Sequence, residues 1–236
     1  METSATPSWF IDEVAHAGSE HLDAQYVPTY DRKAGTDPHE DLVLLQQLGL
    51  SGSQTLVDLG AGTGTFALAA APVCRRVVAV DVSREMLAVL GEKLARSGIT
   101  NVEIVRGGFL SYAHRGEPAD FVYSRHALHH VPDFWKALAL ARIATILKPG
   151  GVLYLRDLVY SFDPDDAERV IDGWLAGAST DPGSGWTRPE LETHLRDEYS
   201  TFSWLLEPMI ERAGLKIHDV QHTASIFSAY TCIMSE

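Results

Sequence analysis

The sequence lacks the features that mark nucleic-acid-binding, secreted and membrane proteins. Its 236 residues include 19 Lys and Arg against 32 Asp and Glu, a formal charge of −13, with no basic run. Such a charge repels the phosphates of DNA or RNA, so we predict no nucleic-acid partner. No apolar stretch approaches the roughly 20 residues that span a bilayer. Residues 1–10 lack the basic and apolar regions of a signal peptide. We therefore expect a cytoplasmic protein with no membrane partner.

Cysteine is scarce as well. Cys74 and Cys232 are the two cysteines, and their separation matches no zinc or redox motif. We predict that both are small core residues in a reducing compartment. The remaining composition, with 45% hydrophobic and 22% charged residues, is that of a globular protein. Collagen, coiled coil and disorder are thereby excluded as the main state.

From about residue 41 onward, apolar runs typical of buried strands alternate with helical patterns. The predicted strands are 55–59, 77–81, 102–105, 120–124, 152–155, 215–221 and 226–233. Alternation of strands and helices requires right-handed crossovers and gives a doubly wound α/β sheet. The last two strands are separated by a short connection, which implies an antiparallel pair. We therefore predict a mostly parallel sheet with one reversed strand.

The pattern divides the chain into three parts. Residues 1–40 are aperiodic and form a predicted N-terminal cap segment. Residues 41–236 form a single predicted domain. Within it, an irregular insertion at about 160–202 is rich in Pro, Gly and aromatic residues. Long segments of this kind are often functional lids or hold short helices of their own, so we expect a lid here.

A glycine-rich turn, Gly60-Ala61-Gly62-Thr63-Gly64, follows the first predicted strand. In doubly wound sheets, ligands bind at the carboxyl ends of the strands, and glycine lets the backbone approach a ligand closely. The spacing departs from the dinucleotide fingerprint G-x-G-x-x-G, because Thr65 stands where the third glycine belongs. No Gly-Lys-Ser/Thr follows, which excludes a P-loop.

Two aspartates flank this turn along the chain. Asp58 precedes it, and Asp81 ends the second predicted strand. A carboxylate at Asp81 can accept hydrogen bonds from both hydroxyls of a ribose, so the residues describe a nucleoside ligand. Two alternatives stay open: Asp81 could be an N-terminal charge of the helix after Ser83, and Asp58 could hold the turn through backbone N–H groups.

The segment from Val57 to Gly64 resembles motif I of the class I S-adenosylmethionine-dependent methyltransferases. Segments 127–133 and 147–151 are similar to later motifs of that family. The resemblance covers about residues 40–236 and implies a seven-stranded, Rossmann-like α/β sheet, mostly parallel with one antiparallel C-terminal strand. It also implies an enzyme that transfers a methyl group from S-adenosylmethionine (SAM) to a small-molecule acceptor by in-line displacement.

The resemblance further implies a cofactor site of turn and strand-end residues with one residue from the cap segment. These residues are Asp58, Gly60, Ala61, Gly62, Gly64, Asp81, Val82, Met86, Gly108, Phe109, Ser124 and Tyr30. Asp81 stands where the family has its ribose-binding acid, and Met86 where an apolar residue packs on the adenine. Tyr30 is expected to contact the methionine carboxylate.

The sequence departs from the family pattern after the third predicted strand. The family usually has an acid there that holds the adenine amino group, and this chain has Gly108 in its place. The adenine must then be held by backbone groups, by apolar contact with Met86 or Phe109, or by an acid from another segment.

Three histidines, His126, His129 and His130, follow the fourth predicted strand. Histidine titrates near neutral pH and can accept a proton, so these are the candidate catalytic residues. His129 and His130 could instead be packing residues at the entry to the next helix. A metal site built from the histidines and Asp133 lacks a recognised ligand spacing such as H-E-x-x-H, and we predict no metal.

Four residues are candidates for contact with the acceptor: Arg156, Trp174, Trp186 and Tyr199. Arg156 ends the fifth predicted strand and could pair with Asp157 instead. The three aromatic residues lie in the predicted lid, where their faces could attract a cation or simply pack the lid onto the core.

Two other functions remain open. An NAD-dependent oxidoreductase would also bind a ribose through Asp81, although Thr65 opposes this. A non-catalytic SAM- or nucleoside-binding protein would need no acceptor pocket. The sequence does not determine the acceptor, the methylated atom, or the choice between monomer and homodimer.

Overall fold

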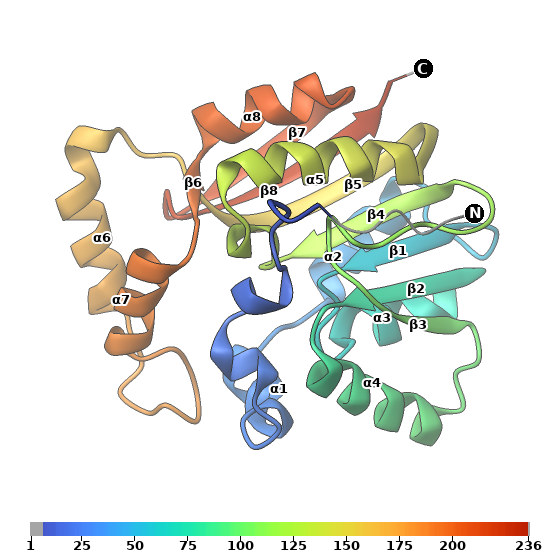
Figure 1. Cartoon of the computed structure of the whole chain (residues 1–236), viewed down its shortest axis with the longest axis horizontal. Helices are drawn as coiled ribbons and strands as arrows, with labels where there is room; N and C mark the ends of the chain where they lie inside the picture. Colours follow the sequence, from blue (N-terminus) through green and yellow to red (C-terminus); the bar gives the residue numbers. More distant parts are fainter. Residues whose placement is uncertain (1–6, 236) are drawn as a thin grey trace.

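A twisted sheet of eight strands runs through the centre of the molecule (Figure 1), whose computed structural model describes residues 7–235. The strands are β1 (Thr55–Leu59), β2 (Arg76–Asp81), β3 (Val102–Arg106), β4 (Ala119–Arg125), β5 (Leu147–Tyr160), β6 (Thr201–Phe202), β7 (Leu215–Thr223) and β8 (Phe227–Met234). Their order is β3-β2-β1-β4-β5-β8-β7, and the two-residue β6 pairs with the end of β5. β8 is antiparallel to both of its neighbours, and every other pair is parallel. The predicted seven-stranded sheet with one reversed strand is confirmed, and β6 is an addition.

Helices connect the strands and extend beyond them. The α-helices are α1 (Tyr30–Ala34), α2 (His39–Gln47), α3 (Thr65–Ala70), α4 (Arg84–Ser97), α5 (Asp133–Ile146), α6 (Ala167–Ala176), α7 (Arg188–Asp197) and α8 (Ser203–Arg212). The short 3₁₀ turns are Val14–His16, Ser19–Leu22, Val27–Thr29, Ala71–Val73, Leu128–His130 and Pro164–Asp166. Among the described residues, none of these helices is long and apolar enough to cross a bilayer.

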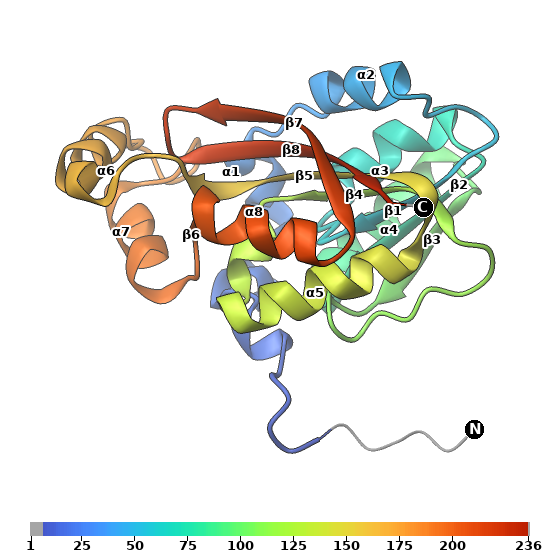
Figure 2. The same cartoon turned by 90° about the horizontal axis from the view of Figure 1, so that it is seen from above.

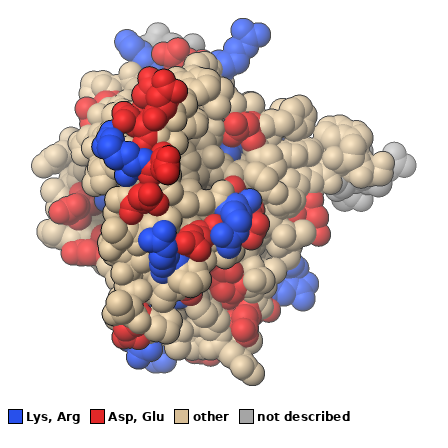
Figure 3. Space-filling view, turned by 90° about the vertical axis from the view of Figure 1, so that its left-hand side faces the viewer, with Lys and Arg blue, Asp and Glu red and all other residues tan. Residues whose placement is uncertain are grey.

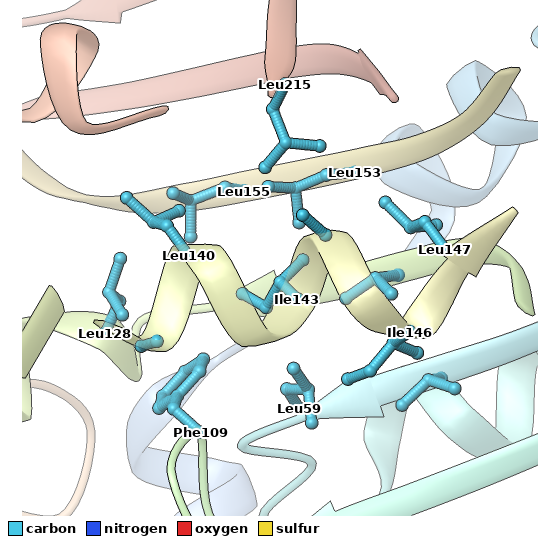
Figure 4. Close-up of a cluster of buried hydrophobic side chains, with 14 of the residues drawn as sticks. Leu59, Phe109, Leu128, Leu140, Ile143, Ile146, Leu147, Leu153, Leu155 and Leu215 are labelled. Carbon is cyan, nitrogen blue, oxygen red and sulfur yellow. The ribbon is translucent and has the colours of Figure 1, made fainter. Parts of the chain in front are cut away.

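Alternate side chains of each strand enter two separate cores, because successive residues of a strand point to opposite faces of the sheet. In β1, Val57 packs into the core under α5 and α8, whereas Leu56 packs into the core under α2, α3 and α4. Figure 2 shows these helix layers on opposite sides of the sheet. In the first core, Leu140 and Ile143 of α5 pack over Leu153 of β5 (Figure 4). Both cysteines are free and buried in these cores, as predicted.

The carboxyl ends of the parallel strands face two covering segments. In Figure 1, the N-terminal segment through α1 (blue) and the pair α6 and α7 (orange) both lie at this end of the sheet. The expected lid contains two ten-residue helices rather than irregular chain. The reason is local: Thr187 and Glu190 form a reciprocal capping box that starts α7, although Pro and Gly dominate the residues before it.

Candidate active site

The three glycines of the turn after β1 all have φ in the left-handed region: 77° for Gly60, 54° for Gly62 and 80° for Gly64. A Cβ on Gly60 would lie 2.3 Å from the Cβ of Ala127, and one on Gly64 would lie 2.2 Å from Leu90 Cδ1. These two positions therefore exclude any side chain. A Cβ on Gly62 would meet nothing within 4 Å, because this residue borders an open cavity.

The cavity lies at the carboxyl edge of the sheet and is bounded by strand-end loops on one side and by the cap segment on the other. Its lining residues are Glu13, Ala17, His21, Tyr30, Gly60, Gly62, Asp81, Val82, Met86, Gly107, Gly108, Phe109, Arg125, His126, Ala127, His130 and Val131. Ten of the predicted site residues are in this lining: Gly60, Gly62, Asp81, Val82, Met86, Gly108, Phe109, Tyr30, His126 and His130. The fold brings them together from five segments of the chain.

Asp81 is fixed at the end of β2 by two backbone groups. Its Oδ2 accepts a hydrogen bond from the N–H of Gly62, and its Oδ1 accepts one from the N–H of Ser83, both at 2.8 Å. Burial raises its pKa, and these two hydrogen bonds oppose that shift. The cap of α4 is Ser83, whose Oγ accepts from Met86 N at 3.0 Å. Asp81 is therefore not needed as the cap, and its carboxylate borders the cavity.

Four of the predicted cofactor residues lie outside the cavity lining: Asp58, Ala61, Gly64 and Ser124. Ser124 is fully buried and donates its hydroxyl to the carbonyl of Leu59 at 2.8 Å. Asp58 is also buried, and its Oδ2 has no hydrogen-bond partner among the described residues. Burial raises its pKa to about 8, so the carboxyl group is largely protonated at neutral pH.

One end of the cavity is apolar and is closed by a carboxylate from the cap segment. Val82, Met86 and Phe109 line it together with Gly108. Glu13 reaches this end from the cap segment: its Oε1 accepts from Leu110 N at 2.9 Å. Its Oε2 accepts from the N–H and the hydroxyl of Ser111 at 2.9 and 2.6 Å. An acid from another segment therefore stands beside Gly108.

His126 occupies the other end, directly after β4, in a strained conformation. Its φ is 51°, a region that L-residues with bulky side chains rarely adopt. The strand ladder holds it there, because its N–H donates to the carbonyl of Arg156 at 2.8 Å. Its Nδ1 is buried without a hydrogen-bond partner in the described part of the chain. Burial lowers the pKa of His126 to about 4, so the imidazole is neutral at pH 7.

His130 has a similar environment, and His129 has the opposite one. Burial lowers the pKa of His130 well below its ordinary value, and its Nδ1 has no partner within residues 7–235. His129 Nδ1 lies 2.5 Å from Asp157 Oδ1, and its Nε2 lies 3.1 Å from Glu198 Oε2. Although burial opposes the charged form, these two carboxylates raise the pKa of His129 to about 9. His129 is thus an imidazolium with both nitrogens engaged, and it is not in the cavity lining.

Glu198 connects this imidazolium to α7. Besides His129, its carboxylate bonds Nδ1 of His194, whose Nε2 bonds the hydroxyl of Ser200 at 2.8 Å. His129, His194 and Glu198 are the group in the described chain whose ligand atoms lie close enough together to hold a metal ion. Hydrogen bonds within the group engage the same atoms.

The two arginines at the strand ends share one buried carboxylate. Asp41 of α2 accepts from Arg125 NH1 at 3.0 Å and from Arg156 NH1 at 3.2 Å. Asp41 also accepts hydrogen bonds from the hydroxyl groups of Tyr123 and Tyr154. Arg156 therefore pairs with Asp41, not with Asp157, and lies outside the cavity lining. Arg125 borders the cavity, and its Nε has no partner in the part of the chain that is described.

The three predicted aromatic residues lie in the covering segments and outside the cavity lining. The Trp174 ring lies 6.4 Å from that of Phe227, which in turn lies 5.7 Å from the His126 ring. Lys33 of the cap segment lies 4.7 Å from the Trp186 ring centroid. The Tyr199 ring is 37% exposed and lies 5.6 Å from that of His16. They pack the lid against the cap segment and against the outer side of the site.

Seven of the lining residues were not predicted from the sequence, and three of these have titratable side chains: Glu13, His21 and Arg125. Glu13 and His21 fall in the aperiodic cap segment, where no pattern separates them from their neighbours. The glycine at 108 was the one signal for Glu13, because an acid from another segment was one of the alternatives that it left open. Arg125 stands between Ser124 and His126 at a strand end, and that position was its signal.

A doubly wound sheet with a partly buried acid at the end of β2 and a glycine turn after β1 is an arrangement in which α/β proteins commonly bind nucleotides. Residues 56–151 match the family model of a methyltransferase domain. An uncharacterised methyltransferase of Geobacillus kaustophilus is 26% identical over 219 residues, which are 89% of this chain and 95% of that protein. Another from Bacillus subtilis is 30% identical over 53% of this chain and 49% of its own length.

Solved structures agree on the fold. Phosphoethanolamine N-methyltransferase 2 of Haemonchus contortus, in complex with SAM, has a TM-score of 0.71 at 15% identity, covering 98% of this chain and 62% of that one. A SAM-dependent methyltransferase of Aquifex aeolicus has a TM-score of 0.59 at 17% identity, covering 95% of this chain and 100% of that one. The matched domain, the methyltransferase relatives and the shared fold together support a class I SAM-dependent methyltransferase.

Proposed function

We propose that the protein transfers a methyl group from SAM to a small-molecule acceptor by in-line displacement. The observation that carries this proposal is one cavity with two chemically different ends. At one end a partly buried carboxylate, Asp81, stands beside an open glycine turn. At the other, two neutral imidazoles, His126 and His130, have unpartnered nitrogens among the described residues.

The residues present fit the proposed cofactor. Asp81 is placed to accept both ribose hydroxyls, and Gly62 leaves the space beside it free. Val82, Met86 and Phe109 offer apolar surface for the adenine. Burial raises the pKa of Tyr30 to about 12, so this hydroxyl stays a hydrogen-bond donor for the methionine carboxylate at every working pH.

When bound, SAM supplies an electrophilic methyl group on its sulphonium. The task of the protein is alignment, which is worth up to about 7–11 kcal/mol, and exclusion of water. We assign His126 the role of accepting the proton that the methyl acceptor loses, because its neutral imidazole can accept a hydrogen bond from an O–H or N–H group. We assign His129 a positioning role, because both of its nitrogens already bond carboxylates.

Enclosure supports a small acceptor. The cap segment and α7 meet over the site: Lys33 pairs with Glu190, and Arg32 Nε donates to the carbonyl of Gly183 at 3.1 Å. The face that carries α6 and α7 mixes acidic with basic side chains (Figure 3), which disfavours a polyanion. The Haemonchus enzyme, by its name, acts on a small molecule, so this fold accommodates one.

Titration calorimetry with S-adenosylhomocysteine (SAH) and NADH tests the cofactor. We expect SAH to bind with micromolar affinity and NADH to give no heat. An assay of SAH formation from SAM in the presence of small alcohols, amines, thiols and carboxylic acids then tests which acceptor is methylated. Binding of NADH without SAH would favour an oxidoreductase, and SAH binding with no turnover on any acceptor class would favour a non-catalytic binding protein.

A further inference from the structure

We propose that Glu13, from the cap segment, is the group that recognises the amino edge of the adenine. This assignment rests on the proposed use of SAM. It makes the cap segment a part of the cofactor site, not only its cover.

The Glu13 carboxylate occupies the space that a side chain at position 108 would fill. A Cβ on Gly108 would lie 2.3 Å from Glu13 Oε1 and 2.6 Å from its Cδ. At contacts under 3.0 Å one group must shift, so a side chain at position 108 would displace the Glu13 carboxylate from its present place. Gly108 is thus the residue that admits a carboxylate from 95 positions earlier in the sequence.

The hydrogen bonds of Glu13 fix its orientation and leave one acceptor site free. A carboxylate offers about four lone-pair sites. Leu110 N takes one on Oε1, and the N–H and hydroxyl of Ser111 take two on Oε2. The remaining site is on Oε1, the oxygen nearest to Gly108. A carboxylate oxygen is a stronger acceptor for an N–H group than a neutral oxygen is.

The position of the ribose determines which part of the ligand reaches Glu13. With the ribose hydroxyls at Asp81, the base extends along the cavity toward Val82, Met86 and Phe109. These three residues provide apolar contact for the faces of a flat ring. Gly108 and Glu13 border the same end of the cavity. Polar groups on the edge of the ring therefore face the Glu13 carboxylate. This carboxylate accepts a hydrogen bond from an amino group and repels a carbonyl oxygen.

The chemistry of the edge gives a direct test with two ligands. SAH carries a 6-amino group on its purine, and S-inosylhomocysteine carries a 6-oxo group in the same place. We expect wild-type protein to bind SAH at least ~10-fold more tightly in titration calorimetry, because the 6-oxo ligand cannot donate a hydrogen bond to the charged carboxylate. In Glu13→Ala the two affinities should converge to within about threefold. Asp12→Asn, at an exposed acid of the same segment, is the matched control and should keep the wild-type ratio.

The ratio separates recognition from simple closure of the cap. A residue that only latches the segment would, when removed, weaken both ligands equally and leave their ratio unchanged, and that result would overturn the assignment. Retained binding of S-inosylhomocysteine by Glu13→Ala shows that the variant is folded. Failure of wild-type protein to bind SAH would instead reject the proposed function on which this assignment rests.

Discussion

The two ends of the cavity differ in how completely the protein satisfies its own polar groups. At the Asp81 end, both carboxylate oxygens have backbone donors, and Glu13 has three donors of its own. At the His126 end, buried nitrogens of His126, His130 and Arg125 have no partner in the described chain. Buried polar groups are normally hydrogen-bonded, and exceptions gather where a ligand supplies the partner. On the proposed function, the first end is preformed for the cofactor, and the second is completed by the acceptor.

Two neighbouring histidines sharpen the same contrast. His129 is charged and has carboxylates on both sides, whereas His126, three residues earlier, is neutral and unpartnered within the described residues. One bonded network thus holds the η5 turn, Leu128–His130, in place, because Asp157 also accepts from the N–H of Leu128 at 2.7 Å. This rigid support on one side is consistent with the strained backbone of His126 on the other.

The largest expected effect comes from breaking the preformed end. Asp81→Ala removes the acceptor for both ribose hydroxyls, and we expect SAH affinity to fall by ~100–1,000-fold, since each hydrogen bond to a charged group contributes about 1.5–3 kcal/mol. The variant should keep its circular dichroism spectrum, because Ser83 still caps α4. Titration calorimetry measures the loss, with Asp219→Ala on exposed β7 as control. Unchanged affinity would remove the ribose assignment.

A smaller and separable effect is expected at the other end. His126→Asn removes the proton acceptor while keeping a residue that tolerates positive φ. We expect kcat for methyl transfer to fall by about 100-fold and the Kd of SAH to stay within about twofold. His218→Asn, an exposed histidine on β7, should change neither. A raised KM with unchanged kcat would instead make His126 a binding residue for the acceptor.

The smallest effect is on stability and follows from the raised pKa of His129. Its contribution to stability is fully present below the unfolded pKa of about 6.5 and is lost as pH rises through about 9. We expect the free energy of unfolding in urea to drop by about 2 kcal/mol between pH 6.5 and 9.5, as one pKa unit is about 1.4 kcal/mol. His129→Gln should lack this decline. An equal decline in the variant would mean that another group titrates.

For His126 we expect the opposite dependence of stability on pH. Its pKa of about 4 in the folded protein means that its contribution is present above pH 6.5 and is lost as pH falls toward 4. Acid titration of His126→Asn in the same urea experiment separates the two histidines.

The sequence by itself determined the sheet and the parts of the site that follow a strand directly. The strand pattern, the short final connection and the glycine turn predicted a mostly parallel sheet, and Gly62, Asp81 and Met86 lie together at the carboxyl edge of that sheet. These features are local: a strand end, a turn and the first turn of a helix position their residues without help from distant chain.

Tertiary structure alone decided what lies across from that edge. Glu13 lies against Gly108, and Asp41 forms ion pairs with Arg125 and Arg156. These residues are far apart in the sequence, so no local pattern predicts the contacts. The charge states of His126 and His129 were equally invisible in sequence, because burial and the carboxylates around each ring set them in opposite directions. Periodicity encodes which face of an element is buried, whereas the partner that a buried polar atom finds depends on how the whole chain closes over it.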